Sequence, residues 1–409
     1  MKFNDLNLSD PITRSLKDQG YEKPTPIQTE VIPAILNKSD VMAAAQTGTG
    51  KTAAFVLPIL SMLSNPKNNY KGHQLRALIL TPTRELAAQV RESVNTYSKY
   101  LSIRSTAVYG GARIHNQRLK LRKGVDVLVA TPGRLLDLYN QKAVNFKNIE
   151  LFVLDEADQM LDMGFIHDIK KIANLLPDRR QNLMFTATFS NPFRKLAKEM
   201  ADKAIEISVT TDGEAGENIE HYCHPVDKSR KAELLIELIE TQNWDQALVF
   251  TRTKHGADRL QKQLEKVEIS AKAIHGNKTQ NNRMKALDAF VNNRVKILVA
   301  TDVAARGIDI KKMSQVINFD VPTVAKDYIH RIGRTGRGGD KGKAITLVSA
   351  DEFRLLSDIE KLLGQKLERV EIEGFEPEHV VPAKEKQKPK NKKFHNRGGF
   401  KNRRRSRKG

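Results

Sequence analysis

The chain has 409 residues, of which 39% are hydrophobic, and this length predicts two domains rather than a single core. Its one cysteine, Cys223, excludes an intrachain disulfide and a cluster of thiolate ligands, so we expect a protein of the reducing cytoplasm. The net charge of +21 favours a polyanionic partner, and we see neither a signal-like N-terminus nor an apolar run of about 18 residues, which argues against export and a membrane span.

The first 40 residues combine a short helix with a proline-rich turn. Leu8–Pro11 has the pattern of a helix start, and Gly20 is typical of a helix end. The turn that follows contains Tyr21 and Gln28 beside two prolines. An amide can bond the N6/N7 edge of adenine while an aromatic ring stacks on the base, so these side chains are candidates for a base pocket. Taken alone, the turn is equally compatible with a solvent-exposed loop.

The next segment has the layout of a phosphate-binding loop between the strand candidate Asp40–Ala44 and the helix candidate Ala53–Leu60. Its glycines allow backbone N–H groups to converge on an anion, while Lys51 reaches the outer phosphates and Thr52 a magnesium ion. Ala45 replaces the usual first glycine, which the turn tolerates if φ stays negative. The predicted loop consists of Ala45, Gln46, Thr47, Gly48, Thr49, Gly50, Lys51 and Thr52.

Four further β-rich runs in the first half end in polar loops. These strand candidates are Leu75–Leu80, Val125–Ala130, Ile149–Leu154 and Leu183–Phe185. Buried strands that alternate with helices predict a parallel sheet whose carboxyl-terminal loops form one ligand edge. Asp155 and Glu156 directly follow the third run, where a phosphate-loop ATPase places one carboxylate for magnesium and another for the attacking water.

A second copy of this design follows. Residues 208–218 lose hydrophobic periodicity and gain glycine, threonine and acidic residues, which predicts a flexible linker. Strand candidates resume, without a phosphate loop, at Ala247–Phe250, Ala271–Ile274, Val295–Ala300 and Val316–Phe319. The glycine-rich segment Tyr328–Gly338 contains Arg331, Arg334 and Arg337. These arginines are either a solvated turn or fingers directed at a nucleotide on the first domain.

From about residue 372 the chain is poor in apolar residues and is expected to be a disordered tail. Residues 384–409 contain thirteen Lys/Arg and one acidic residue, Glu385. Such a segment can follow a nucleic-acid backbone, and a purely solubilising tail has the same composition. The predicted boundaries are a first domain at 1–207, a linker at 208–218, a second domain at 219–371 and a tail at 372–409.

These segments, in this order, resemble the DEAD-box RNA helicases of superfamily 2 and are most similar to the bacterial RhlE-type branch. The resemblance covers residues 3 to about 365 and is carried by Gly20–Gln28, Ala45–Thr52, Pro82–Leu86, Gly110-Gly111, Thr131–Arg134, Asp155–Asp158, Gln280–Arg283, Ala305–Asp309 and His330–Arg337. It implies an α/β fold of two tandem RecA-like parallel-sheet domains. It also implies an ATP- and Mg²⁺-dependent, RNA-stimulated ATPase that opens short RNA duplexes or remodels RNA–protein complexes.

The same resemblance assigns roles to individual positions. ATP-binding positions beyond the loop are Phe3, Tyr21, Gln28 and, at the ribose, Asp309. Catalytic positions are Lys51, Asp155, Glu156 as general base, Arg334 and Arg337, and the metal positions are Thr52 and Asp155. RNA-backbone positions are Pro82, Thr83, Arg84, Gly111, Thr131, Gly133, Arg134, Arg252, Arg283 and Thr301. Positions that couple hydrolysis to unwinding are Asp158, Thr186, Thr188 and His330.

One position departs from the family pattern. Thr186 replaces the usual serine but keeps its hydroxyl, so its hydrogen bonding to the Asp155–Asp158 loop is expected to survive. The coupling of ATP hydrolysis to strand separation is the property that this substitution would affect.

Two other functions remain compatible with the sequence. An RNA chaperone or annealing protein would use ATP as a clamp and bind RNA mainly through the basic tail. If strand separation needs hydrolysable ATP, the protein is a helicase and not such a chaperone or annealing protein. A DNA translocase with the same core would respond equally to single-stranded DNA. The preference for RNA rests on the family resemblance, because contacts to the 2′-hydroxyl cannot be read from spacing.

Overall fold

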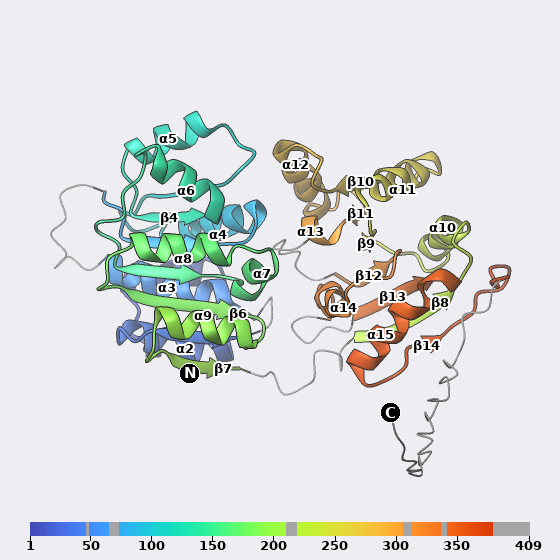
Figure 1. Ribbon diagram of the computed structural model, residues 1–409, viewed down its shortest axis with the longest axis horizontal. Helices are drawn as coiled ribbons and strands as arrows, with labels where there is room; N and C mark the ends of the chain where they lie inside the picture. The colour runs from blue at the N-terminus through green and yellow to red at the C-terminus, as the bar shows by residue number, and fades with distance from the viewer. Residues whose placement is uncertain (46–48, 65–72, 210–218, 306–312, 337–341, 379–409) are drawn as a thin grey trace, which may run out of the picture.

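The structure is a computed structural model of the whole chain and describes residues 1–45, 49–64, 73–209, 219–305, 313–336 and 342–378. These residues form two α/β domains that lie side by side, each built on a seven-stranded parallel sheet (Figure 1). The predicted fold of two tandem parallel-sheet domains is therefore confirmed. Within the described ranges, no helix is both long and apolar enough to span a bilayer.

The first sheet has the strand order β3-β4-β2-β5-β6-β1-β7. Its strands are β1 (Val41–Ala44), β2 (Ala77–Leu80), β3 (Ser105–Val108), β4 (Val127–Ala130), β5 (Leu151–Leu154), β6 (Gln181–Thr186) and β7 (Ile205–Ser208). The central strands are buried on both faces because helices cover both sides, which explains their uninterrupted apolar runs. The edge strands β3 and β7 are partly exposed and more polar, and the sequence patterns did not identify them.

The helices of the first domain pack in two layers. They are η1 (Phe3–Leu6), α1 (Asp10–Asp18), α2 (Pro26–Leu36), α3 (Lys51–Leu63), α4 (Arg84–Tyr97), α5 (Ile114–Arg122), α6 (Pro132–Asn140), α7 (Ala157–Asp162), α8 (Ile166–Leu175) and α9 (Asn191–Met200). Residues of α2, α3 and α4 share one core with the sheet, and residues of α6 to α9 share another. The Phe55 and Phe185 rings, 5.0 Å apart, fix α3 against β6.

The second sheet repeats this order as β10-β11-β9-β12-β13-β8-β14, so β8 occupies the place of β1. Its strands are β8 (Ile219–Pro225), β9 (Ala247–Phe250), β10 (Ala271–Ile274), β11 (Ile297–Ala300), β12 (Gln315–Asn318), β13 (Gly342–Val348) and β14 (Glu368–Arg369). Its helices are α10 (Lys231–Thr241), α11 (Lys254–Lys266), α12 (Gln280–Val291), α13 (Asp302–Ala305), α14 (Ala325–Ile332), η2 (Ala350–Glu352) and α15 (Phe353–Leu363). The internal repeat inferred from the sequence thus corresponds to two sheets with the same order of strands.

Two domain ends differ from the predicted boundaries. Ser208 closes strand β7 and so belongs to the first domain instead of the linker. Residues 372–378, assigned to the tail, lie on the second domain, where Phe375 packs against the core and Arg230 lies 4.4 Å above its ring. Arg230 also donates from Nη1 to the Gly374 carbonyl at 2.6 Å. The rest of the predicted linker, apart from Val209, and the tail from residue 379 lie outside the described residues.

Candidate nucleotide site and RNA-binding edge

A buried lysine without a partner marks the predicted phosphate site. Lys51 is the first residue of α3, and Gly50 before it adopts the left-handed conformation with φ of +92°. The Lys51 side chain is 6% exposed, and its Nζ has no hydrogen-bond partner among the described residues. Burying an unpaired ammonium is unfavourable, so this geometry indicates an anionic ligand at the helix N-terminus.

The rest of the predicted loop is only partly described. Gln46, Thr47 and Gly48 lie outside the described residues. Ala45 has no positive φ, which meets the condition set by the loss of the usual glycine, and its N–H donates to the Thr186 carbonyl at 3.1 Å. Thr52 is half-buried in the first turn of α3, one residue after Lys51.

Two buried acids follow strand β5. Asp155 is 2% exposed, and Glu156 has a left-handed φ of +52°, a conformation that is uncommon for non-glycine residues and is enriched at active sites. Burial raises the pKa of Asp155 to about 7; the Glu156 charge adds to this effect and the Lys51 charge opposes it. Burial also raises the pKa of Glu156. Two carboxyl groups with raised pKa values beside an unpaired lysine form a candidate catalytic centre.

The second domain contributes positive charge to this centre. Burial is the main influence on the pKa of Glu156, and the charges of Lys51, Arg334 and His330 oppose it, so Arg334 and His330 lie near Glu156 across the domain boundary. Arg334 is 6% exposed and follows helix α14. The predicted positions Arg337 and Asp309 lie outside the described residues.

The remaining arginine of this segment has a structural role. Arg331 is almost fully buried, and its Nε lies 2.6 Å from Asp302 Oδ1. Its Nη1 donates to Asn318 Oδ1 at 3.0 Å and to the Asp320 carbonyl at 2.7 Å. Its charge is therefore compensated inside the second domain. Arg331 differs in this from Arg334, whose charge acts on Glu156 of the first domain.

The predicted adenine amide faces the phosphate loop instead of solvent. Gln28 is 5% exposed, its Oε1 accepts from the Thr25 N–H at 3.0 Å, and its Nε2 donates to the Gly50 carbonyl at 3.1 Å. One N–H and one lone pair of the amide stay available for an adenine edge. Tyr21 is 45% exposed, whereas Phe3 is buried in the core. The turn thus joins the base-pocket candidates to the end of the loop.

Asp158 connects the acidic segment to strand β6. Its Oδ2 accepts a hydrogen bond from the Ala187 N–H at 3.0 Å. The Thr186 hydroxyl donates to the Thr188 carbonyl at 2.9 Å and so stays within its own loop. The predicted link between these segments is therefore made by a backbone N–H, which a serine at position 186 would leave unchanged.

The RNA positions of the first domain lie together at the carboxyl ends of β2, β3 and β4. Thr83 caps α4 by accepting from the Leu86 N–H at 3.3 Å. The Arg84 guanidinium packs so closely on Gly111 that a Cβ there would lie 1.9 Å from Nη1. Arg134 Nη1 donates to the Ala112 carbonyl at 3.1 Å. Pro82 and Thr131 are buried in the same edge, and Gly133 is exposed.

A charged contact joins the two domains beside this edge. Glu85, which is 1% exposed, accepts from Gln280 Nε2 at 2.9 Å and lies 3.0 Å from Arg283 Nη2. Arg283 is therefore engaged with the first domain. Sequence reasoning gave no role to Glu85 or Gln280, because their pairing spans 195 residues.

Arg252 belongs to an internal network of the second domain. Its Nη2 lies 2.7 Å from Glu352 Oε1, and its backbone N–H donates to Asp320 Oδ2 at 2.8 Å. The other Glu352 oxygen accepts from the Lys231 Nζ, which also donates to the Phe319 and Leu347 carbonyls at 2.9 and 2.8 Å. The sequence offered no signal for Lys231 or Glu352. Thr301 is half-buried, and its carbonyl accepts from the first turn of α13.

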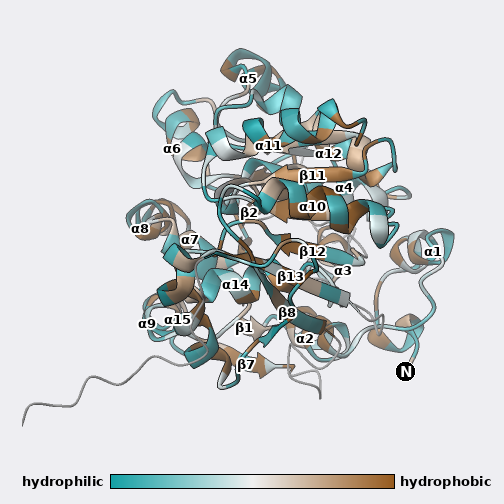
Figure 2. Cartoon of the chain, turned by 90° about the vertical axis from the view of Figure 1, so that its right-hand side faces the viewer, coloured by the Kyte–Doolittle hydropathy of each residue, from teal (hydrophilic) through white to brown (hydrophobic). Residues whose placement is uncertain are grey.

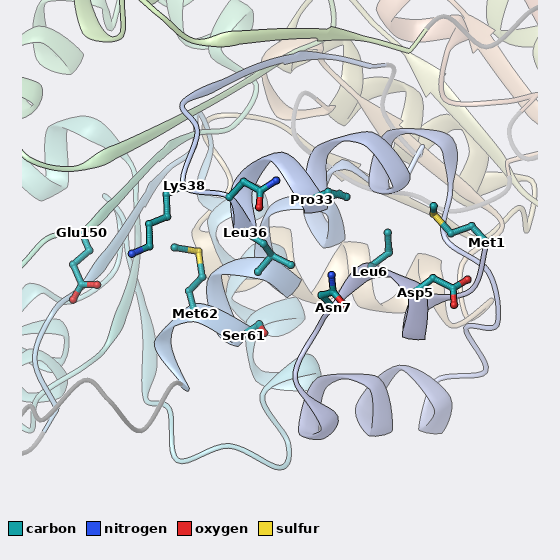
Figure 3. Close-up of a pocket in the computed structure, with 11 residues that line it drawn as sticks. Met1, Asp5, Leu6, Asn7, Pro33, Leu36, Lys38, Ser61, Met62 and Glu150 are labelled. Carbon is teal, nitrogen blue, oxygen red and sulfur yellow. The ribbon is translucent and has the colours of Figure 1, made fainter.

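A separate cavity lies away from these motifs. It measures about 570 Å³ and is bounded by η1 and the C-terminal parts of α2 and α3. Figure 3 shows Asp5, Lys38, Met62 and Glu150 among the side chains around it. None of its lining residues was predicted as a site residue, so the cavity is distinct from the candidate centre.

Taken together, the fold and the site define a class: a two-domain P-loop nucleotide hydrolase whose first domain holds the phosphate-facing lysine and acids. The family model described as DEAD/DEAH box helicase matches residues 25–208, and the helicase conserved C-terminal domain matches residues 230–339. The chain belongs to the DEAD-box ATP-dependent RNA helicases, and it is accordingly an ATPase that binds ATP.

Individual relatives agree with this assignment. The DEAD-box ATP-dependent RNA helicase RhpA of Helicobacter pylori is 40% identical over 379 residues, which cover 93% of this chain and 76% of RhpA. Dbp5 of S. cerevisiae, bound to RNA and ADP BeF3, is 34% identical with a TM-score of 0.80, covering 90% of this chain and 95% of Dbp5. A DEAD box protein from Methanococcus jannaschii is 39% identical over 90% of this chain and 99% of its own, with a TM-score of 0.53.

Proposed function

We propose that the protein opens short RNA duplexes or remodels RNA–protein complexes by closing its two domains around ATP and RNA. The observation that carries this proposal is the meeting of charges from both domains. Lys51 Nζ has no partner among the residues of the first domain that the structure describes, and the Arg334 charge acts on Glu156 from the second domain. Hydrolysis would then depend on closure, because neither domain alone holds the complete set of charges.

The residues divide the chemistry among themselves. Lys51 binds the outer phosphates, and Gln28 selects adenine through its remaining donor and acceptor. The Glu156 carboxylate takes a proton from the attacking water while the water oxygen bonds to the γ-phosphorus and ADP leaves with the electrons of the broken P–O bond. A raised pKa favours Glu156 as the proton acceptor. Arg334, joined by Arg337, stabilises the charge on the transferred phosphoryl group.

The same centre fits a magnesium ion. Asp155 is a buried carboxylate, and Thr52 follows the phosphate-facing lysine. In the described part of the chain, no three His, Cys, Asp or Glu side chains form a metal cluster, which fits an ion bound mainly by phosphates and water. Mg²⁺, when bound, neutralises phosphate charge. Thr52 and Asp155 would hold it.

RNA would lie along the edge formed by the Arg84, Gly111, Thr131 and Arg134 loops. Contacts of this type bind phosphates and position a strand without reading its sequence. The Glu85 contacts to Gln280 and Arg283 tie this edge to the second domain, so RNA binding and closure would favour each other. The TM-score of 0.80 to Dbp5 bound to RNA supports RNA binding by this chain.

We also infer a place in the cell and in the family. The short core and basic composition fit the RhlE-type branch, and the reducing cytoplasm fits the single buried Cys223. Ribonucleoprotein or RNA-decay partners are consistent with local remodelling. The basic tail would add sequence-independent RNA affinity.

The experiment compares Glu156→Gln with wild type in ATP hydrolysis and strand separation. The amide cannot accept the proton, so turnover should fall by about 10²- to 10⁴-fold while ATP and RNA binding persist. Glu92→Gln, at an exposed position outside the site, is the matched control. Near wild-type turnover of Glu156→Gln would remove Glu156 as the base. Strand separation by wild type with a non-hydrolysable ATP analogue, at the same rate as with ATP, would favour the annealing or clamp protein.

A further inference from the structure

The outer edge of the first sheet carries a basic surface that the motif loops do not include. Residues 93–125 contain seven Lys/Arg and no acidic residue. Five of these cations lie on or next to α5, and we call them the α5 surface: Arg113, Arg118, Lys120, Arg122 and Lys123. Helix α5 lies at one end of the first domain in both views (Figures 1 and 2).

The charges of the α5 surface are not compensated by the protein. Arg113, Lys120, Arg122 and Lys123 are exposed, and among the described residues no carboxylate lies within ion-pair distance of any α5-surface cation. Some surface cations of this domain are paired, as Lys170 is with Glu199, and what distinguishes the α5 surface is five cations close together without an acidic residue from position 93 to 125. Like charges crowded on one helix repel each other, so a surface of this kind is stabilised by an anionic partner.

The surface is held in a fixed position. The Gln117 side chain accepts from the Tyr109 N–H at 3.1 Å and donates to the Tyr109 carbonyl at 3.0 Å, which joins α5 to the end of β3. Leu121 is buried beneath the helix, and Arg104 Nη1 donates to the Lys123 carbonyl at 3.0 Å. An anion would therefore meet a preformed surface and not a mobile loop.

The α5 surface continues the edge already assigned to RNA. Gly111 and Ala112 lead directly into α5, and Arg134 donates to the Ala112 carbonyl at 3.1 Å. Helix α5 has nine residues and so is about 14 Å long, on the order of four nucleotides along one strand of a duplex. A strand that leaves the Gly111 loop along this helix would pass its cations in turn.

We propose that the α5 surface is a further RNA-binding site that takes the sugar–phosphate backbone of the strand as it leaves the motif loops. This inference rests on the proposed RNA edge. The partner is a polyanion and not a membrane, because the apolar side of α5, with Leu121, is turned into the core and leaves Leu119 as an isolated exposed apolar side chain. Recognition is of phosphates, so it is independent of sequence.

The test removes three of the charges. The variant Lys120→Gln/Arg122→Gln/Lys123→Gln keeps good helix formers, and Lys195→Gln/Lys198→Gln/Lys203→Gln removes three exposed lysines on and just after α9, far from α5 in both views. Affinity for single-stranded RNAs of increasing length is measured at several salt concentrations in the full chain. Each neutralised phosphate contributes about −0.7 to the slope of log K against log salt, so the α5 variant should lose about 2 from that slope.

For long RNAs, wild type should then lose about 18-fold more affinity than the α5 variant between 50 and 200 mM salt. The gap between them should shrink as the RNA is shortened toward the length that fills only the motif loops, and the α9 control should match wild type. Parallel salt lines for wild type and the α5 variant with long RNA would overturn the proposal and leave the surface to an acidic protein. A wild-type ATPase that RNA does not stimulate would overturn the proposed function itself.

Discussion

The two domains share a topology, but the buried lysine at the equivalent position of each domain has different surroundings. Lys51 is the first residue of the helix after β1, and Lys231 is the first residue of the helix after β8, the strand that takes the place of β1. Both side chains are buried. In the described part of the chain Lys51 Nζ has no hydrogen-bond partner, whereas Lys231 Nζ donates to two carbonyls and to Glu352.

The acids at the equivalent strand ends differ in the same way. Asp155 follows β5 with a raised pKa because burial leaves it insufficiently compensated. Asp320, near the end of the equivalent strand β12, accepts from the Arg252 N–H at 2.8 Å. The second domain thus satisfies internally the charges that the first domain leaves for a ligand. The shared fold therefore does not show which domain holds the nucleotide site. Buried charges without sufficient compensation do, and they lie in the first domain.

Arg334 is the exception to this contrast, because it belongs to the second domain but is proposed to act on the nucleotide bound by the first. Arg334→Ala should lower the turnover of RNA-stimulated ATP hydrolysis by about 10³-fold or more, because an arginine finger contributes about 10³- to 10⁵-fold. ATP binding to the first domain should persist. Arg354→Ala, at an exposed position on α15, is the control. Near wild-type turnover of Arg334→Ala would show that the second domain supplies no finger through this residue.

Replacing a buried glutamate by glutamine should change the free energy of unfolding differently in the two domains. Glu352→Gln removes the anion that pairs with buried Lys231, and breaking a buried ion pair costs about 3–5 kcal/mol. Glu156→Gln removes a carboxylate whose charged form burial disfavours, so it should not destabilise the protein. Urea unfolding of both variants measures the difference. Lys231→Met/Glu352→Gln should recover part of the loss, since no unpaired charge is left. Equal stability of Glu352→Gln and wild type would contradict this assignment.

The two domains should also differ in how their buried acids make the free energy of unfolding depend on pH. Asp155 has a pKa raised by burial to about 7, above the ordinary 3.8, so the folded protein retains a proton that the unfolded chain releases. The free energy of unfolding should therefore fall as the pH rises from about 4 to 7. Asp155→Asn should remove the part of this fall that Asp155 causes, while Glu156 keeps its own part, and should be more stable than wild type at pH 8, by at most about 4 kcal/mol.

Unfolding by urea from pH 4 to 8, without nucleotide or magnesium, measures this effect. The two proteins should have similar stability near pH 4, where Asp155 is protonated in the folded protein and about half protonated in the unfolded chain. Asp320→Asn in the second domain is the companion variant, and it should not gain stability at pH 8 because the charged acceptor of the Arg252 N–H is replaced by a weaker neutral one. Wild type and Asp155→Asn with the same pH dependence would show that folding does not raise the pKa of Asp155.

The smallest expected effect concerns the base pocket, which only the first domain has. Gln28→Ala should reduce discrimination against GTP by about 1–3 kcal/mol, because the bidentate contact with adenine is lost. Competition between ATP and GTP for binding measures it, with the exposed Gln19→Ala as control. An unchanged preference for ATP would assign Gln28 to holding Gly50 and Thr25 instead of the base.

The sequence by itself determined the parallel sheets and the loops that carry the site. Hydrophobic runs of strand length are local, and each predicted run contains or overlaps a strand, as Ala247–Phe250 does for β9. Lys51, Asp155 and Glu156 could be located because the carboxyl ends of parallel strands share one edge. Edge strands β3, β7 and β14 lacked this signal, since they are partly exposed or only two residues long, and the internal strands β8 and β13 were not predicted either.

Only the tertiary structure decided which charges are compensated. Arg252 and Lys231 look like surface cations in the sequence, yet Glu352 binds both from 100 and 121 residues away. Glu85 reads as an ordinary first-turn acid, yet it is buried between the domains against Arg283. Whether a charge is paired depends on burial and on partners distant in the chain, and neither has a local periodicity that a sequence displays.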